Sequence, residues 1–373
     1  MPGKFSGQLD FSPIGDLDKA KTEKLDVLVI GAGFAGMYIL KMLKDAGYNV
    51  LVVEEADGVG GTWYWNRYPG ARCDVPSLEY SYGFSEELQQ EWEWSSKYST
   101  QPEILEYANH VADRFDLRPY IRFGQRVMTA EYLEESKSWY VVTSLGNQYE
   151  SRFCVMATGS ISAINKPKFA GLDSFKGDWY LTGRWPHENV DLSGKSVGIV
   201  GTGSSGVQTI PMLAQKAKHL TVFQRTANYS IPARNRPLDP EEVKEIKSNY
   251  GAVRERQRKT RAGIMVRLEE DFDNYITVNP GMKSALEVSV GERTKEYQQR
   301  WENGFHGFLA GYTDIGLNED ANETAAEFVR SKIRETVKDP ATAEILSPKN
   351  AIGCKRLCAD TNYFETYNRE NVS

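Results

Sequence analysis

The stretch LDVLVIGAGFAG, residues 25–36, runs from a β-branched apolar segment directly into three glycines spaced G-x-G-x-x-G. Such an apolar segment is typical of a strand buried in a parallel sheet, and the residues after the turn favour a helix over 34–46. In a dinucleotide-binding turn, the first glycine permits the turn, the second lets the backbone approach a pyrophosphate, and the third lets the helix pack on the strand. These glycines are Gly31, Gly33 and Gly36, so the stretch predicts a nucleotide-binding unit.

A second predicted strand, YNVLVVEE at residues 48–55, continues this unit. It reaches Glu54, where an acidic side chain is placed to accept hydrogen bonds from a ribose. An ordinary glycine-rich turn of an α/β protein is the competing interpretation. The order of strand, turn, helix, strand and acid favours the nucleotide site, which suits FAD or NAD.

The same order recurs in KSVGIVGTGSSG, residues 195–206. Its turn consists of Gly201, Thr202, Gly203, Ser204, Ser205 and Gly206. The next predicted strand, HLTVFQ, carries no acid and ends instead on Gln224 and Arg225. An arginine pairs with a 2′-phosphate that a carboxylate would repel, so this second unit predicts an NADP(H) site. A solvated surface arginine is the alternative interpretation of Arg225.

Two dinucleotide units in one chain imply hydride transfer between two bound cofactors, most economically from NADPH to FAD. A disulfide reductase would need a redox pair such as C-x-x-C near the flavin. The only close cysteine pair, Cys354 and Cys358, is spaced C-x-x-x-C and lies far along the chain. Thiol chemistry is therefore disfavoured.

Composition limits the class of protein further. The chain has 373 residues, 40% of them hydrophobic, and a net charge of −6, which does not favour a nucleic acid or an anionic membrane as partner. No apolar run approaches the roughly 20 residues that span a bilayer, and the N-terminal arm over residues 1–24 lacks the apolar core of a signal peptide. Four cysteines form no disulfide framework, so a reduced, cytoplasmic location is expected. The histidines are not clustered, and no metal site is predicted.

Two further motifs carry a resemblance to a known family. The first is GVGGTWYWNRYPGARCD at residues 58–74, and the second is FKGDWYLTGRWP at residues 175–186. They resemble the fingerprints G-G-x-W-x(4)-Y-P-G-x(3)-D and F-x-G-x-x-x-H-x-x-x-W-P of Baeyer–Villiger monooxygenases, closest to the branch that acts on steroids and large cyclic ketones. The resemblance covers nearly the whole chain after residue 25. It implies an α/β fold with two Rossmann-like domains and a helical insert.

The resemblance also gives roles to particular residues. Residues implied to lie against FAD are Thr62, Trp63, Trp65, Asp74 and Tyr80, with the Val127 backbone at the adenine. The segment CKRLCADTNYFETYNRENV, residues 354–372, resembles the active-site strand of the family. It implies that Arg356 is catalytic and is oriented by Asp74, and that Lys355 helps to hold the NADP phosphate. Without the resemblance, Arg356 would be interpreted as a surface arginine.

The implied reaction uses NADPH and O2 to insert one oxygen atom next to the carbonyl of a cyclic or steroid-like ketone, through a C4a-peroxyflavin. The peroxide anion and the tetrahedral intermediate are both negative, and a fixed arginine would stabilise that charge. One alternative is a flavin monooxygenase that oxidises nitrogen or sulfur. Another is a non-catalytic or uncoupled remnant of the family.

The family also implies a division of the chain. An FAD-binding domain is expected over residues 1–165, an NADP-binding domain over 166–228 and 345–373, and a helical insert over 229–344. In the insert, Ala325, Phe328, Val329 and Ile333 recur at helical spacing, and the basic run RERQRKTR at 254–261 is interpreted as a solvated helix face.

The chain departs from the family pattern in two places. Leu181 stands where the linker motif has histidine, which favours impaired coupling between the domains or natural drift at a structural position. An engineered or sequencing-level change from histidine to leucine is the alternative interpretation. Relatives continue past Ser373 with segments that complete the FAD domain, so the chain is expected to expose sheet edge and apolar surface.

Overall fold

The computed structural model describes residues 21–259, 283–305 and 307–373, which form two compact units. The first unit comprises Met1–Arg67 and Pro102–His187, and the second comprises Tyr68–Gln101 and Glu188–Ser373. Predictions about the arm before residue 21, and about the end of the basic run at residues 260–261, lie outside the described residues. The predicted domain boundaries stay a prediction.

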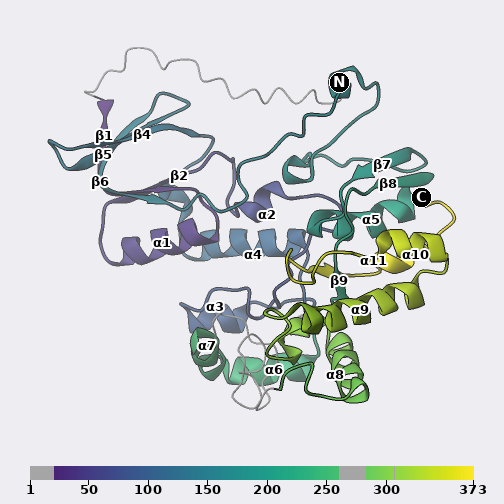
Figure 1. Ribbon diagram of the computed structural model, residues 1–373. Helices are drawn as coiled ribbons and strands as arrows, with labels where there is room; N and C mark the ends of the chain where they lie inside the picture. Colours follow the sequence, from purple (N-terminus) through teal and green to yellow (C-terminus); the bar gives the residue numbers. More distant parts are fainter. Residues whose placement is uncertain (1–20, 260–282, 306) are drawn as a thin grey trace. The chain divides into compact units, whose positions relative to one another are not determined.

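The first unit is built on a six-stranded sheet in the order β3-β2-β1-β6-β5-β4 (Figure 1). Its strands are β1 (Glu23–Ile30), β2 (Val50–Val53), β3 (Ile121–Arg122), β4 (Val127–Leu133), β5 (Ser138–Thr143) and β6 (Gln148–Met156). β1 pairs in parallel with β2 and β6, whereas β4, β5 and β6 form an antiparallel meander. The two strands predicted around the first glycine-rich turn are therefore neighbours in one sheet.

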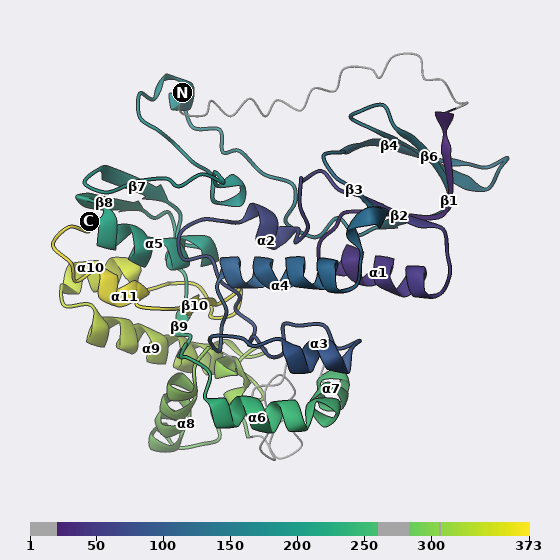
Figure 2. The ribbon, with the colours of Figure 1, turned by 180° about the vertical axis from the view of Figure 1, so that it is seen from behind.

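Two helices cover the same side of this sheet, α1 (Phe34–Asp45) and α4 (Gln101–Arg114) (Figure 2). Their apolar side chains share one core with β1 and β2; its buried members include Val27, Val29, Met37, Leu40, Val52, Ala108 and Ala112. α1 confirms the helix predicted after the first turn and ends one residue early. A shorter helix, α2 (Thr62–Trp65), and two 3-10 turns, η3 (Leu172–Ser174) and η4 (Thr182–Arg184), complete the elements discussed below.

The second unit holds the second glycine-rich turn between β7 (Ser196–Val200), α5 (Ser204–Lys216) and β8 (His219–Phe223). β7 and β8 pair in parallel, and a bridge from Leu220 to Val372 brings the last residues of the chain beside β8. A second small sheet joins β9 (Ser230–Pro232) to β10 (Cys358–Asp360), and α3 (Glu86–Glu91), α10 (Pro340–Leu346) and α11 (Tyr363–Thr366) lie in the same unit. Both predicted strands of this turn are confirmed.

The middle of the chain is helical, as predicted. Its elements are α6 (Pro240–Ser248), α7 (Tyr250–Lys259), α8 (Val290–Asn303), the 3-10 turn η6 (Phe308–Gly311) and α9 (Glu319–Thr336). Side-chain oxygens of Asp239, Ser289 and Asn318 cap α6, α8 and α9 by accepting hydrogen bonds from first-turn N–H groups. The predicted amphipathic face of α9 is confirmed, because Ala325, Phe328, Val329 and Ile333 are all buried.

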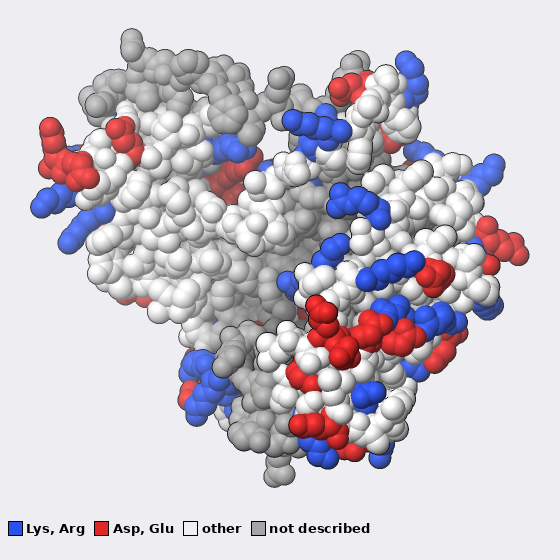
Figure 3. Space-filling view, viewed as in Figure 1, with Lys and Arg blue, Asp and Glu red and all other residues white. Residues whose placement is uncertain are grey.

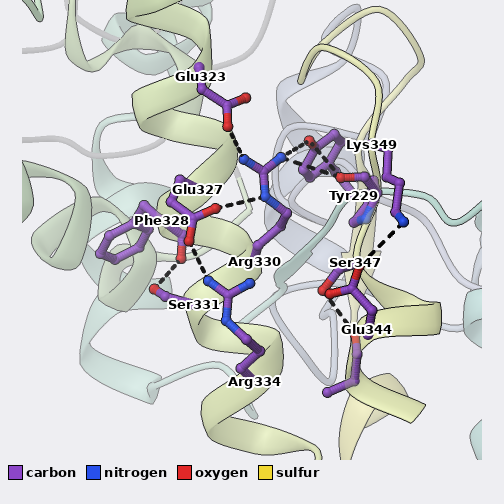
Figure 4. Close-up of polar contacts among 12 residues, drawn as sticks. Tyr229, Glu323, Glu327, Phe328, Arg330, Ser331, Arg334, Glu344, Ser347 and Lys349 are labelled. Carbon is purple, nitrogen blue, oxygen red and sulfur yellow. Dashed lines mark hydrogen bonds and ion pairs between the residues drawn. The ribbon is translucent and has the colours of Figure 1, made fainter. Parts of the chain in front are cut away.

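The opposite face of α9 is charged but internally paired (Figure 4). Arg330 forms ion pairs with Glu323 and Glu327, and it donates to the Tyr229 hydroxyl at 3.2 Å and to the Pro348 carbonyl oxygen at 3.3 Å. Glu327 also binds Arg334. Figure 3 shows acidic and basic side chains mixed over the described residues of this face. The network holds the chain just before the predicted active-site segment.

Several large apolar side chains are exposed on the sheets, as expected from the sequence. Val200 on β7 is 64% exposed and Phe223 on β8 is 55% exposed, while Phe153 and Met156 on β6 are 50% and 61% exposed. None of the helices in the described residues is both long enough and apolar enough to cross a membrane.

Candidate cofactor-binding and active-site residues

The first glycine-rich turn needs glycine for reasons visible in its contacts. Gly31 has a φ of 103°, and a Cβ there would lie 2.7 Å from the carbonyl oxygen of Ala157. A Cβ on Gly36 would collide with the carbonyl oxygen of Gly31. Gly33 caps α1 without any side-chain hydrogen bond, so the first-turn N–H groups of α1 are not capped by a side chain. These features fit a pyrophosphate at the helix N-terminus.

Glu54 is fixed beside this turn. Its side chain is buried, and its two oxygens accept hydrogen bonds from the Ala32 N–H at 2.6 Å and the Ala56 N–H at 2.8 Å. Each carboxylate oxygen keeps a second lone pair, so the group can still accept a ribose hydroxyl. Gln125 N–H donates to the Glu54 carbonyl oxygen at 2.9 Å, which brings the start of β4 at Val127 close to Glu54.

The aromatic fingerprint follows directly and packs against the same turn. Gly60 N–H donates to the Ala32 carbonyl oxygen at 3.0 Å, and a Cβ on Gly33 would lie 3.5 Å from the Gly61 Cα. Thr62, Trp63 and Trp65 then form α2, with Thr62 exposed, Trp63 buried and Trp65 partly buried. The sequence-predicted FAD residues of the first unit are thus brought together: the three glycines, Glu54, α2 and Val127.

The linker motif belongs to the first unit as well. Its aromatic side chains pack on one another, with the Tyr180 and Trp185 ring centroids 5.3 Å apart. Leu181 is partly buried at the start of η4, and its carbonyl oxygen accepts from the Arg184 N–H at 3.0 Å. The ring contact and the hydrogen-bonded turn give this stretch a defined local structure, unlike a loose interdomain linker.

The second glycine-rich turn repeats the local geometry of the first. Gly201 has a φ of 103°, its N–H donates to the Phe223 carbonyl oxygen at 2.9 Å, and a Cβ on Gly206 would collide with the Gly201 carbonyl oxygen. Thr202 is buried, whereas Gly203 and Ser204 are exposed. Gly203 caps α5 without a side-chain hydrogen bond, so this helix N-terminus also fits a phosphate.

The two residues after β8 lie at the edge of this turn. Gln224 donates to the Ile345 carbonyl oxygen at 2.8 Å, which fixes its amide, and Arg225 is exposed. Among the ion pairs of the described residues, none involves Arg225. A solvent-facing guanidinium at this position is compatible with a 2′-phosphate.

The Y-P-G part of the fingerprint lies in the second unit, against α5. Tyr68 donates from its hydroxyl to Gln208 Oε1 at 2.8 Å, and Gln208 Nε2 donates to the Arg72 carbonyl oxygen at 3.0 Å. Burial raises the pKa of Tyr68, while a hydrogen bond to Ser205 acts in the opposite direction. Gly70 has a φ of 84° and a Cβ there would press on the Gln208 backbone. Only glycine permits this close approach.

Gln208 was missed by the sequence analysis. The available signal is a polar residue two positions after the last glycine of the turn, next to Val207 in the first turns of the helix. Tyr80, the other predicted site residue in this region, lies partly exposed near Asp74 in sequence, and its N–H donates to the Pro76 carbonyl oxygen at 2.9 Å.

Asp74 and Arg356 form an ion pair within the second unit, although 282 residues separate them in sequence. The Arg356 side chain is 70% exposed and that of Asp74 is 24% exposed, so the cation is presented to solvent while its carboxylate partner is held by the protein. The contact that the family resemblance implies is therefore present. Lys355 is exposed beside them.

One expectation about this segment is wrong. The predicted active-site strand over residues 354–372 is a strand only at Cys358–Asp360, and Lys355 and Arg356 lie in the irregular segment before it. Its partner β9 has only three residues and ends at Pro232, which cannot donate a ladder hydrogen bond. Asn362, with a φ of 60°, then turns the chain into α11.

The cysteines are all free thiols. Burial raises the pKa of Cys73 to about 12 and also raises the pKa of Cys358, so these thiols stay protonated near neutral pH. Thiol–disulfide chemistry has no thiolate to start from at either position. Among the described residues, no group of His, Cys, Asp and Glu side chains is arranged to hold a metal ion.

Comparisons with known proteins agree with this geometry. The profile of the pyridine nucleotide-disulphide oxidoreductase family matches residues 28–265. A Baeyer–Villiger monooxygenase of Pseudooceanicola batsensis is 43% identical over 93% of this chain and 62% of its own length. The structure of an oxidized steroid monooxygenase bound to NADP is similar, with 52% identity, a TM-score of 0.87, and coverage of 94% of this chain and 65% of that chain.

A third similar protein is OTEMO, whose structure is a complex with FAD and NADP. It has 40% identity and a TM-score of 0.87, over 94% of this chain and 65% of that chain. The chain spans about two thirds of the length of the relatives that it matches.

Proposed function

Because the chain belongs to the pyridine nucleotide-disulphide oxidoreductase family, among its Baeyer–Villiger monooxygenases, we propose that it acts as an NADPH- and O2-dependent flavin monooxygenase. It inserts one oxygen atom next to the carbonyl of a cyclic or steroid-like ketone and yields a lactone or ester. The observation that carries the proposal is the ion pair between Asp74 and Arg356.

FAD and NADPH are the cofactors in this proposal. The first turn, Glu54, α2 and Val127 hold FAD, with Asp74 and Tyr80 contributing, and the second turn, Gln224, Arg225 and Lys355 hold NADPH. The crowded third glycines, Gly36 and Gly206, and the N-caps without a side-chain hydrogen bond suit a dinucleotide at both turns. The buried carboxylate of Glu54 beside the first turn and the exposed Arg225 beside the second support the division between FAD and NADPH. Reduced flavin, when bound, supplies the electrons that activate O2.

Arg356 carries the chemistry that the chain itself provides. An arginine stays protonated at any working pH and offers donors to an oxygen atom on which negative charge develops. Removing one such donor from a comparable site costs about 2.7–4 kcal/mol of transition-state stabilisation. Asp74 orients the guanidinium, and the exposed 70% of the Arg356 side chain leaves its other donors free for the reacting group.

The two alternative functions do not require the Asp74–Arg356 ion pair. Oxidation of nitrogen or sulfur by a flavin hydroperoxide needs no fixed cation, and a non-catalytic remnant has no reason to keep both charges together. The partners in the proposal are a small-molecule ketone and O2. A cytoplasmic location is part of it, supported by four unpaired cysteines.

The test is ketone-dependent NADPH oxidation by the FAD-supplemented protein, with cyclohexanone and a steroid ketone, and product mass as readout. We expect a gain of one oxygen atom. Arg356→Met should lower the rate of product formation about 100- to 1,000-fold while FAD is retained. Asp74→Asn should lower it less, because the cation remains.

The matched control is Arg334→Met. Arg334 belongs to the same unit and also forms an ion pair with a carboxylate, that of Glu327. This variant should leave product formation unchanged. Full activity of Arg356→Met would contradict the proposed role. NADPH loss that produces only hydrogen peroxide would favour the uncoupled alternative.

A further inference from the structure

The linker motif places one cation against the FAD fingerprint. The guanidinium carbon of Arg184 lies 3.7 Å from the centre of the Trp65 ring, a distance at which a cation and an aromatic face attract each other. Both residues belong to the first unit. The Trp65 ring is also close to His187, which follows the linker motif and is the last residue of the first unit, with ring centroids 6.1 Å apart.

Acidic and basic side chains surround this guanidinium. Arg184 Nη2 lies 3.6 Å from Glu55 Oε1, and Arg126 Nη1 lies 3.3 Å from the same oxygen. One carboxylate oxygen is therefore shared by two guanidiniums. Burial lowers the pKa of Arg184, and the charges of Glu55 and Glu54 oppose that shift. Glu54 is already committed to two backbone N–H groups.

The second terminal nitrogen of Arg184 lacks a partner. Nη1 is buried and makes no hydrogen bond to any described residue. A buried donor of a charged group is rarely left unpaired in a folded protein, because its lost hydration is not replaced. A bound ligand with an acceptor atom at this position would supply the missing hydrogen bond to Nη1.

The surroundings indicate which acceptor this is. Glu55 follows Glu54, the predicted ribose ligand, and Arg126 precedes Val127, the predicted backbone contact of the adenine. Both neighbours of Arg184 thus flank residues expected at the adenosine half of FAD. We propose that Arg184 is an FAD-binding residue of the linker, which donates from Nη1 to the adenosine half of the cofactor while Trp65 holds the guanidinium in place.

This inference rests on the proposed function, since it requires that the first unit binds FAD. It gives the linker motif a second reason to be strict: the segment supplies part of the cofactor site.

The experiment measures the dissociation constant of FAD from the apoprotein by quenching of flavin fluorescence, together with thermal unfolding of the apoprotein. Arg184→Met keeps the apolar stem and removes the donors. We expect FAD to bind about tenfold more weakly to this variant. The apoprotein should unfold at the same temperature as the parent or higher, because the buried unpaired donor is gone. A purely structural clamp would instead destabilise the apoprotein.

Two further variants sharpen the test. Arg184→Lys keeps the charge without the planar fork and should bind FAD at least threefold more weakly than the parent. Arg126→Met removes the other guanidinium on Glu55 but leaves Arg184 and Trp65 unchanged, and it should change FAD affinity less than twofold. An Arg184→Met protein with FAD affinity within twofold of the parent would overturn the inference. Failure of the parent itself to bind FAD would instead overturn the proposed function.

Discussion

The two glycine-rich turns have the same local geometry in different surroundings. Gly31 and Gly201 both have a φ of 103°, and each donates its N–H to the last residue of the neighbouring strand. In both turns the third glycine lies against the carbonyl oxygen of the first. The motif therefore encodes the same turn twice, independent of the unit that contains it.

The surroundings differ in how tightly they hold the turn. Gly31 faces the Ala157 backbone at the end of β6, within a six-stranded sheet. Around Gly201 no heavy atom lies within 4 Å of a Cβ position, and its strand belongs to a two-stranded sheet with Val200 exposed. The tolerance of a turn to substitution therefore depends on contacts from distant segments, which the motif does not encode.

The largest expected effect comes from placing alanine at the first glycine of each turn. In Gly201→Ala the alanine is strained only by the positive φ, which should lower the free energy of unfolding by about 1–2 kcal/mol. Gly31→Ala has the same backbone strain, and its Cβ would also collide with the Ala157 carbonyl oxygen. This variant should therefore lose FAD and unfold at a lower urea concentration than Gly201→Ala. Urea unfolding measures the loss of stability, and the flavin content per chain measures the loss of FAD.

Each variant has a control in its own unit. Gly124 and Gly194 also have positive φ values, of 68° and 70°, with no heavy atom within 4 Å of a Cβ position. Because these φ values are nearer the left-handed region that L-residues adopt, Gly124→Ala and Gly194→Ala should each cost no more stability than Gly201→Ala, and both should leave the cofactors bound. Equal loss of stability in Gly31→Ala and Gly201→Ala would remove the distinction between the turns.

The sequence alone predicts what depends on local pattern. Both βα turns, their strands and the amphipathic face of α9 follow from glycine spacing and apolar periodicity. The pairing of Asp74 with Arg356 needed the family resemblance, because 282 residues separate them. The hydrogen bonds of Gln208 and the stacking of Arg184 on Trp65 depend on which surfaces the fold brings together. The short β10 depends on the length of its partner β9.

A second prediction concerns the buried carboxyl group of Asp360, on the strand beside the second turn. β10 packs against α5, with Cys358 Sγ 3.6 Å from Ser204 Oγ. Burial raises the pKa of Asp360 from 3.8 to about 7, opposed by a hydrogen bond from the Tyr363 N–H. Between pH 4 and 7 the folded state thus keeps a proton that the unfolded state releases, and stability falls as pH rises through this window.

Asp360→Asn keeps an oxygen for the Tyr363 N–H and removes the titration. The free energy of unfolding of the parent should fall by up to roughly 1.4 kcal/mol per pH unit relative to the variant across this window, and the difference should level off above pH 7. Parallel stability profiles of the two proteins from pH 4 to 8 would contradict the predicted shift.

The smallest expected effect concerns the side chains at the ends of β2 and β8. These are Glu54 in the first unit and Arg225 in the second. Arg225 is exposed, so its replacement should cost little stability. If its guanidinium binds a 2′-phosphate, Arg225→Gln should weaken NADPH binding about tenfold and leave NADH binding unchanged, because NADH has no such phosphate. Lys195→Gln, which removes another exposed cation just before β7, should alter neither. Equal losses for NADPH and NADH would mean that Arg225 supports the turn rather than the phosphate, and the two strand ends would then no longer explain a difference in cofactor choice.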